Sequence, residues 1–380
     1  MSKLEQLIKD KCPNGVEYVK LGEVCTITKG KTPIQKAIPG EYPLVVTTSE
    51  RKSCNTYQFD NAAVCIPLVS SRGHGVASLN HVYFQSGKFA LGNILCAVIP
   101  NDENILSANF LFHYLEYKKD TLLVPLMKGG ANVSLHIDDI QRVKIPLPPV
   151  EIQSKIIEIL DKFVELSDVL SKELTARKKQ YEYYRDLLLD FGVHKEATSD
   201  HKIHTIADLC CIQTGKLNAN AATQNGKYLF FTCDKEPSRI DNYAFDTDAI
   251  LISGNGSQVG HLHDYNGKFN AYQRTYVLSA FSGNVIKRYL FLYMSAYLKD
   301  YILQNCKKAS IPYITLPMLQ SFEIPIPEIK EQERIVSILD RFDKLCNDIS
   351  EGLPAEIEAR RKQYEYYRDK LLSFKSVKGD

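Results

Sequence analysis

The sequence has no apolar run approaching the roughly 18 residues that a membrane-spanning helix needs. Its first segment, MSKLEQLIKDKC, lacks the apolar core of a signal peptide. We therefore expect a cytoplasmic protein with no membrane partner. Apolar residues make up 44% and charged residues 24% of the 380 residues, which is typical of a globular chain with about two or three domains.

The ten cysteines include no CxxC pair, so the sequence favours neither a zinc ribbon nor a disulfide framework. We expect them to be buried as small apolar side chains. The net charge is only +2, without the basic excess of many nucleic-acid binders. Such binding stays open, because charge can gather on one face or come from a partner.

The motifs of common enzymes are also missing. No GxxxxGK[ST] phosphate loop is present, and GNGSQVG at 254–260 is one residue too long for a dinucleotide fingerprint and opens no helix pattern. We interpret it as a turn. Neither the Asn/Asp-Pro-Pro-aromatic segment of adenine methyltransferases nor a Ser/His/Asp or Cys/His signature occurs. We predict a non-enzymatic chain without a cofactor.

Three possible metal ligands, His261, His263 and Asp264, lie close together in the sequence. No further spaced pair of ligands accompanies them. We interpret them as polar loop residues and predict no metal site.

What the sequence does contain is a repeat of itself. ARKKQYEYYRDLLLDF at 176–191 returns almost unchanged as ARRKQYEYYRDKLLSF at 359–374. Upstream, KIPLPPVEIQSKIIEILDKF matches EIPIPEIKEQERIVSILDRF, and KLGEVCTITKGK matches TIADLCCIQTGK. IPLVSSRGHGVASL matches ILISGNGSQVGHL more loosely, and SGKFALGN and NGKFNAYQ follow in the same order. The chain is a duplication of a globular segment, a Pro-rich hinge and a long helix.

Short β-rich runs bounded by Gly, Asn or Pro dominate both globular segments. They are YPLVVTT, AAVCIPLVSS and NILCAVI in the first, and KYLFFTC, DAILISG and TYVLSAF in the second. Each segment also has one stretch with apolar residues at helical spacing, at 107–123 and 286–304. We predict two mixed α/β domains of about 130 residues each.

A 4-3 alternation after each hinge indicates a coiled-coil seam. An unbroken helix over 151–191 would be about 60 Å long and would need a partner helix, for which the other copy is the obvious choice. In the second helix one extra four-residue step coincides with EGLPAE, where Gly352 and Pro354 should kink or interrupt it. The two seams are Ile156, Leu160, Phe163, Ser167, Leu170, Leu174, Arg177, Tyr181, Tyr184, Leu188, Phe191, and Ile335, Leu339, Phe342, Cys346, Ile349, Leu353, Ile357, Arg360, Tyr364, Tyr367, Leu371, Phe374.

Antiparallel pairing of these helices would relate the two halves by a pseudo-twofold axis and place the domains at opposite ends. Such a molecule would read two separated sites on a twofold-symmetric ligand, of which double-stranded DNA is the commonest. Helix length would then set the spacing of the half-sites.

Over about residues 15–374 the sequence resembles the DNA-specificity (S) subunits of type I restriction–modification enzymes. The most specific elements are the paired starts PLPPVEIQSKIIEILDKF and PIPEIKEQERIVSILDRF, followed by EGLPAEIEARRKQYEYYRDKLL. The resemblance implies two target-recognition domains that each bind one half of a split DNA sequence. It also implies conserved helices that hold the halves apart and dock methyltransferase subunits. The first helix departs from the second in lacking the GLPA segment.

The implied organisation is a target-recognition domain at 1–148, a conserved helix at 149–195, a second recognition domain at 196–327 and a second helix at 328–380. The fold class is mixed α/β, with two domains separated by two long antiparallel coiled-coil helices. The implied partners are double-stranded DNA, two methyltransferase subunits that bind S-adenosylmethionine and methylate adenine, and restriction subunits with ATP-driven translocase and nuclease activity.

DNA contacts are then expected from polar loops of the two domains, through cations on phosphates and amide or guanidinium groups on base edges. Arg72 and Arg274 are favoured because each lies next to Gly or aromatic residues where the copies match in order. The candidates are Lys29, Lys31, Thr32, Arg51, Lys52, Ser71, Arg72, His74, Lys128 and Asn132 in the first domain, and Lys216, Asn218, Lys235, Arg239, Asn255, Ser257, Gln258, Tyr272, Gln273, Arg274, Lys307 and Lys308 in the second.

The repeated QYEYYRD block has two interpretations. Tyr181, Tyr184, Tyr364 and Tyr367 lie on the seams, which predicts helix–helix packing. Tyr and Arg are also enriched at interface hot spots, so the off-seam residues are candidates for docking another protein. These off-seam residues are Tyr183, Arg185, Tyr366 and Arg368.

Two rival functions remain open at this stage. A coiled-coil scaffold could join proteins without touching DNA, and a gel shift with and without the methyltransferase partner would identify it. A stand-alone enzyme would show ATPase or methyl transfer by the isolated chain.

Overall fold

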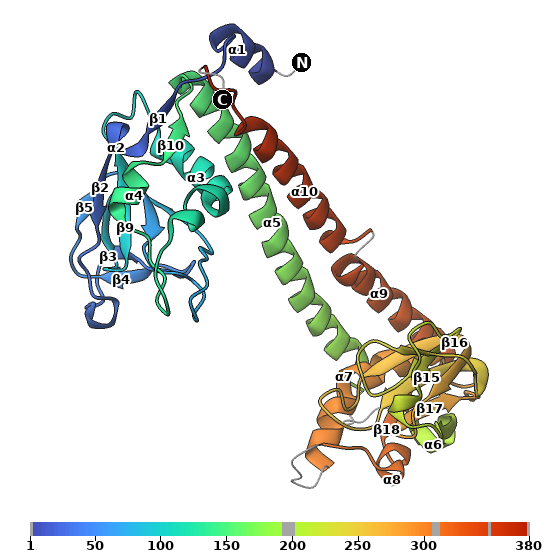
Figure 1. Cartoon of the computed structure of the whole chain (residues 1–380). Coiled ribbons are helices and arrows are strands. Elements are labelled where there is room, and N and C mark those ends of the chain that lie inside the picture. Colours follow the sequence, from blue (N-terminus) through green and yellow to red (C-terminus); the bar gives the residue numbers. More distant parts are fainter. Residues whose placement is uncertain (1–2, 192–201, 306–311, 349–350, 378–380) are drawn as a thin grey trace. The chain divides into compact units, whose positions relative to one another are not determined.

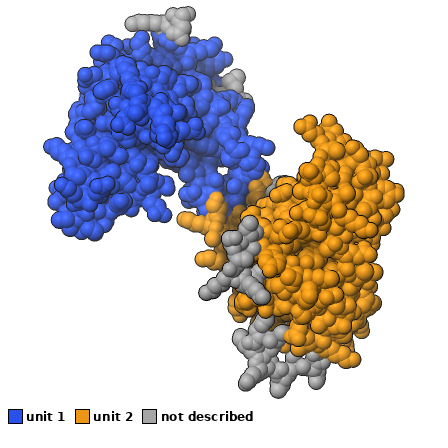
Figure 2. All heavy atoms as spheres, turned by 60° about the horizontal axis from the view of Figure 1, so that its bottom comes forward, with its two compact units in different colours: residues 1–170, 357–380 blue, residues 171–356 orange. Residues whose placement is uncertain are grey.

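The computed structural model describes residues 3–191, 202–305, 312–348 and 351–377, which form two compact units. Unit 1 comprises residues 1–170 and 357–380, and unit 2 comprises residues 171–356 (Figure 2). Each unit therefore combines one globular domain with helical segments from both halves of the sequence. Within the described ranges, no helix is long and apolar enough to cross a membrane.

The domain of unit 1 is built on two four-stranded sheets, in the orders β2-β9-β6-β7 and β4-β3-β8-β5, and on the pair β1-β10. The pairing is antiparallel throughout these sheets except between β3 and β8. Its elements are α1 Lys3–Lys11, β1 Tyr18–Lys20, α2 Leu21–Val24, β2 Cys25–Lys29, η1 Ile34–Lys36, β3 Tyr42–Val45, β4 Lys52–Cys54, β5 Phe59–Asp60, β6 Ala63–Pro67, β7 Tyr83–Gln85, β8 Lys88–Leu91, β9 Leu95–Pro100, α3 Ala108–Leu122, η2 Val124–Leu126, α4 Ile137–Gln141 and β10 Lys144–Pro146.

The domain of unit 2 repeats this arrangement around one six-stranded sheet, β12-β17-β15-β16-β13-β14, and the pair β11-β18. Here the parallel pair is β13 and β16. Its elements are β11 Lys202–Thr205, α6 Ile206–Leu209, β12 Cys211–Thr214, η3 Ala219–Ala221, β13 Tyr228–Phe231, β14 Ser238–Ile240, β15 Phe245–Ser253, β16 Leu262–Ala271, β17 Thr275–Ser279, α7 Lys287–Asn305, α8 Leu316–Gln320 and β18 Glu323–Ile326.

The central strands are buried on both faces, which explains why they read as continuous apolar runs. In β6, Val64 and Ile66 belong to the core that includes α3, whereas Ala63 and Cys65 belong to the core on the other face. In β15 the same alternation assigns Ile250 to the core beneath α7. All six predicted strand runs and both predicted domain helices are confirmed.

The long helices differ between the copies as the sequence predicted. The first is one unbroken 40-residue helix, α5 Val150–Leu189. The second is interrupted: α9 Ile329–Asn347 ends before Gly352, and α10 Leu353–Leu371 begins after it. The described seam positions are buried or half-buried, while Ile349 lies outside the described residues.

The helices pair antiparallel within each unit. In unit 2 the Tyr184 ring stacks on Phe342, whereas Arg177 and Lys178, earlier in α5, act electrostatically on Cys346, later in α9. In unit 1, Phe163 of α5 contacts Tyr364 and Tyr367 of α10, which ends beside the start of α5 (Figure 1).

The cysteine prediction is right only in part. Among the nine described cysteines, five are buried, and burial raises the pKa of Cys25 and Cys96 to about 12. Cys211 is exposed, and three others are half-buried: Cys12, Cys210 and Cys233.

The two ends of the described chain meet in unit 1. The Val16 N–H donates to Lys375 O at 2.8 Å, and the Val377 N–H donates to Val16 O at 3.1 Å. A Cβ atom at Gly15 would lie 2.5 Å from Lys375 O, and φ there is +98°, so this crossing requires glycine. The C-terminal tail is therefore part of the first domain.

Candidate functional site

Several strand ends of each domain meet at one turn, which we call the central turn: residues 91–95 in unit 1 and 271–275 in unit 2. In unit 1 two carbonyl groups of the turn accept hydrogen bonds. The Gly30 N–H donates to Leu95 O at 2.9 Å, and the Leu68 N–H donates to Ile94 O at 2.8 Å. The Asn93 N–H donates to Thr32 O at 2.9 Å. These hydrogen bonds fix the loops after β2, β6 and β8 against one another.

The central turn of unit 2 makes the same backbone contacts with different side chains. The Gly215 N–H points to Thr275 O at 3.4 Å, and the Gly254 N–H donates to Arg274 O at 2.9 Å. The Gln273 N–H donates to Leu217 O at 2.9 Å. The duplication therefore preserved a backbone frame and left its side chains free to change.

Glycine is required where two strands cross at this frame. A Cβ atom on Gly30 would lie 2.2 Å from Gly92 O, and one on Gly215 would lie 1.8 Å from Ala271 O. No side chain fits at such distances without moving backbone. The match between KLGEVCTITKGK and TIADLCCIQTGK, which contains both glycines, thus has a structural cause.

The first turns of each long helix are anchored by a buried glutamine. Gln153 Nε2 donates to Ile105 O and Pro148 O, both at 2.8 Å, and the Ser107 N–H donates to Gln153 Oε1 at 2.9 Å. Gln332 makes the same three hydrogen bonds in unit 2, with Asn284 O, Pro327 O and the Ile286 N–H at 2.8 Å each. Sequence reasoning missed both residues, although the repeat aligns them.

The second anchor uses different chemistry in each copy. In unit 1 the buried His113 places Nε2 at 2.9 Å from Asp161 Oδ1, and Asn109 Nδ2 donates to Asp161 Oδ2 at 3.1 Å. Burial lowers the pKa of His113, against the opposing effect of Asp161. In unit 2 the equivalent residues form an ion pair, in which Arg288 Nε donates to Asp340 Oδ1 at 2.8 Å.

Comparison with known proteins gives this geometry a context. The family model described as the type I restriction modification DNA specificity domain matches residues 13–177 and 198–359.

The chain belongs to this family.

Two relatives and one solved structure illustrate the similarity. The chain is 28% identical over 397 residues to a type I restriction enzyme specificity subunit of Haemophilus influenzae, covering 98% of each. It is 33% identical over 302 residues to the EcoR124I/EcoR124II specificity subunit of Escherichia coli, covering 70% of this chain and 71% of that one. The crystal structure of a type I S subunit from M. genitalium has the same fold, with TM-score 0.65, 15% identity and coverage of 94% and 96%. A specificity subunit is the non-catalytic component of its system.

The residues predicted to contact DNA differ in where the structure places them. Most of them are exposed. Five lie on or beside a central turn: Lys31, Thr32, Tyr272, Gln273 and Arg274. Arg72 and Arg274 do not occupy equivalent positions, because the backbone contacts pair Arg274 with Ile94. Lys307 and Lys308 lie outside the described residues.

Several candidates are engaged within the protein. Ser71 Oγ donates to Ser78 O at 3.1 Å, and Gln273 Nε2 donates to Asn218 Oδ1 at 2.9 Å. The Arg51 guanidinium donates to Gln85 Oε1 at 3.1 Å and to Phe84 O at 3.2 Å, and it lies 5.2 Å above the Tyr83 ring. Lys128 Nζ donates to Asp139 Oδ2 at 3.1 Å. Arg51 is thus a structural residue of its loop.

The interpretation of His261, His263 and Asp264 as polar loop residues is wrong for two of them, because His263 and Asp264 belong to strand β16. The rings of His261 and His263 lie 4.7 Å apart, and burial lowers the pKa of both. No group of three or more His, Cys, Asp or Glu side chains in the described ranges could hold a metal ion. The segment GNGSQVG is a turn, as predicted.

The repeated QYEYYRD block has the same ring geometry in unit 1 and in unit 2. Tyr183 and Tyr366 are 65% and 61% exposed, and each meets its neighbouring seam tyrosine edge to face, at 5.5 Å and 5.4 Å. Arg185 and Arg368 each bind the following aspartate.

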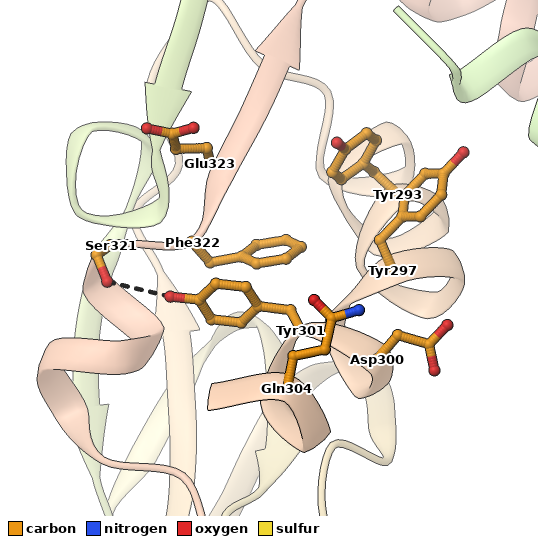
Figure 3. A pocket seen from close by; sticks show the side chains of 8 residues that line it. All are labelled: Tyr293, Tyr297, Asp300, Tyr301, Gln304, Ser321, Phe322 and Glu323. Atoms are coloured by element: carbon orange, nitrogen blue, oxygen red, sulfur yellow. Dashed lines mark hydrogen bonds between the residues drawn. The ribbon is translucent and has the colours of Figure 1, made fainter. Parts of the chain in front are cut away.

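In unit 2 this block borders one of two neighbouring hollows on α7. One of about 410 Å³ is lined by Tyr183, Arg185 and Leu187 together with Tyr297 and Asp300. The other, of about 380 Å³, shares Tyr297 and Asp300 and extends to Tyr301, whose hydroxyl lies 3.2 Å from Ser321 Oγ (Figure 3). Burial raises the pKa of Tyr297 to about 12, and Asp186 and Asp190 add to the rise.

Proposed function

We propose that this specificity subunit recognises a bipartite, asymmetric DNA target with an unspecified spacer. Its two recognition domains, at 1–148 and 196–327, each read one half-site through the loops around the central turn. The observation that carries the proposal is that frame, which repeats the same backbone hydrogen bonds in both domains while exposing different polar side chains. Two domains with the same backbone frame but different exposed side chains can each bind a different DNA half-site.

Phosphate contacts come from the cations beside the frame, and base contacts come from its amides and guanidinium groups. Lys29 and Lys31 serve the first half-site in this proposal. Lys216, Lys235 and Arg274 serve the second. Neutralising phosphates releases counterions, so the affinity falls as salt rises.

The helical segments, at 149–195 and 328–380, dock the partner proteins. The specificity subunit brings together two methyltransferase subunits, one on each QYEYYRD block, and restriction subunits join that complex. The support is the pair of exposed tyrosines, Tyr183 and Tyr366, presented alike in both units. Large aromatic side chains that stay exposed beside an arginine are typical of protein interfaces. A cytoplasmic location, where chromosomal DNA lies, is part of the same proposal.

Methylome sequencing of the host with and without this gene tests the function. We expect one methylated motif to disappear with the gene, and that motif to consist of two specified parts separated by unspecified bases. Methylation of one uninterrupted word would contradict the proposal. A gel shift with mixed duplex, with and without the methyltransferase subunit, separates this function from that of a scaffold that never touches DNA.

A further inference from the structure

The central turn carries a primary amide at the same position in both copies. The backbone N–H of Asn93 in unit 1 donates to Thr32 O in the loop after β2, and that of Gln273 in unit 2 donates to Leu217 O in the loop after β12. Both side chains are exposed. Their neighbours have diverged, since Gly92 and Ile94 stand where Tyr272 and Arg274 stand.

The backbone does not require an amide at this position. Asparagine is common in turns because it tolerates positive φ. Among the described non-glycine residues, positive φ occurs at His74 and Ala280. Each turn is instead fixed by the close approach of a glycine, Gly30 or Gly215. The shared chemistry at Asn93 and Gln273 therefore belongs to the side chain.

In unit 2 a neighbour also orients the amide. Gln273 Nε2 donates one hydrogen to Asn218 Oδ1 at 2.9 Å. The other N–H and the carbonyl oxygen Oε1 stay available, because a primary amide has two donors and one acceptor. Asn218 is thus a positioning residue that fixes the plane of the Gln273 amide.

We propose that Asn93 and Gln273 are the equivalent base-reading residues of the two domains, and that each contacts an adenine of its own half-site. The amide accepts from adenine N6 and donates to adenine N7, the paired contact that Asn and Gln make in the major groove. A rigid turn suits this role because bidentate contacts tolerate little displacement. This inference rests on the proposed function.

The test uses the complex of the full chain with its methyltransferase subunits and duplexes containing the motif found by methylome sequencing. In each duplex one adenine is replaced by 7-deaza-adenine, which lacks the N7 acceptor. For the unchanged complex, we expect one replacement in each half-site to weaken binding by about 5- to 150-fold. Asn93→Ala should remove this sensitivity in the first half-site alone, and Gln273→Ala in the second alone.

Two further variants sharpen the assignment. Gln273→Glu should move the preference at that position from adenine towards cytosine, because a carboxylate accepts from cytosine N4. Asn218→Ala should weaken binding without changing which base is preferred. Asn61→Ala and Asn266→Ala, exposed amides away from the central turns, serve as controls and should change nothing.

The outcomes separate the inference from the function beneath it. Specific binding that keeps its 7-deaza-adenine sensitivity in Asn93→Ala and Gln273→Ala overturns the inference alone. Equal loss on all sequences would also overturn it, because that result indicates phosphate contacts. A complex that binds no sequence specifically overturns both. Unchanged thermal unfolding of each variant excludes misfolding as the cause.

Discussion

Phe163 and Tyr367 stack with their ring centroids 5.4 Å apart and their planes 25° apart. Phe163 belongs to the first copy of the hinge-helix sequence, and Tyr367 belongs to the end of the second. Unit 2 contains the reciprocal pair, Tyr184 on Phe342, at 5.6 Å and 25°. Each unit is thus completed by a helix end from the other copy, so neither half of the sequence has a whole unit of its own.

Loss of a seam tyrosine should destabilise one unit selectively. We expect Tyr367→Ala to lower the free energy of unfolding of unit 1, and Tyr184→Ala that of unit 2, by about 1–2 kcal/mol. Hydrogen exchange resolved by peptide measures each unit separately. Tyr366→Ala and Tyr183→Ala are the matched controls, and each should cost less than the seam variant of its unit because its ring is more than 60% exposed. Equal losses from seam and off-seam variants would refute the pairing.

The same exposed tyrosines should matter for assembly instead. Tyr183→Ala combined with Tyr366→Ala should weaken binding of the methyltransferase subunits by at least about tenfold, because hot-spot residues exceed about 1.4 kcal/mol each. Each single variant should leave one docking site intact, which native mass spectrometry would reveal as a complex with one methyltransferase. Full assembly of the double variant would rule out this surface.

The buried glutamines should be intolerant of isosteric apolar replacement. Gln153→Leu removes the side-chain partner of the Ser107 N–H and of the Ile105 and Pro148 carbonyl groups, and the bond to Pro148 O is buried. We expect a loss of about 1–3 kcal/mol in the unfolding free energy of unit 1. Gln332→Leu should do the same to unit 2. Denaturant unfolding measures the loss, with the exposed Gln320→Leu as control. A near-neutral Gln153→Leu would show that water replaces the amide.

The break between α9 and α10 should depend on Gly352. A Cβ atom there would lie 2.6 Å from Lys344 O and 2.8 Å from Asp348 O, both backbone atoms that cannot move freely. We expect Gly352→Ala to destabilise unit 2 by about 1–3 kcal/mol. Gly283→Ala, where a Cβ atom meets nothing within 4 Å, is the control. If Gly352→Ala and Gly283→Ala shift the thermal unfolding temperature equally, Gly352 is not what determines the break.

Unit 1 should lose stability as the pH falls because of His113. Burial keeps its folded-state pKa below the unfolded value of about 6.5, so the unfolded state takes up the proton first. The contribution is fully present above about pH 6.5 and is lost as the pH falls from there through the folded pKa. His113→Leu, which copies the equivalent Leu292 of unit 2, should flatten the dependence of unit 1 stability on pH. An unchanged slope would assign the effect to other groups.

The sequence by itself determined the local structure and the duplication. The runs around Val64 and Ile250 predict strands, the 4-3 seam predicts α5, and Gly352 with Pro354 predicts the interruption before α10. These features follow from interactions between residues near one another in the chain, such as side-chain periodicity and the backbone limits of Gly and Pro. The repeat also indicated the family, because its hinge-helix motifs are specific.

Only the tertiary structure decided which distant residues meet. The loose loop match aligned Ile66 with Ile250, whereas strand pairing with Cys96 and Tyr276 makes Ile252 the true equivalent. The internal role of Arg51 was equally invisible in the sequence. The repeat aligned Asn93 with Gln273 and indicated antiparallel helices, but only the structure placed that amide on the central turn and showed which rings of the two helices meet. The physical reason is that these contacts join residues tens to hundreds of positions apart. Their partners are set by strand order and helix packing, which no local preference encodes.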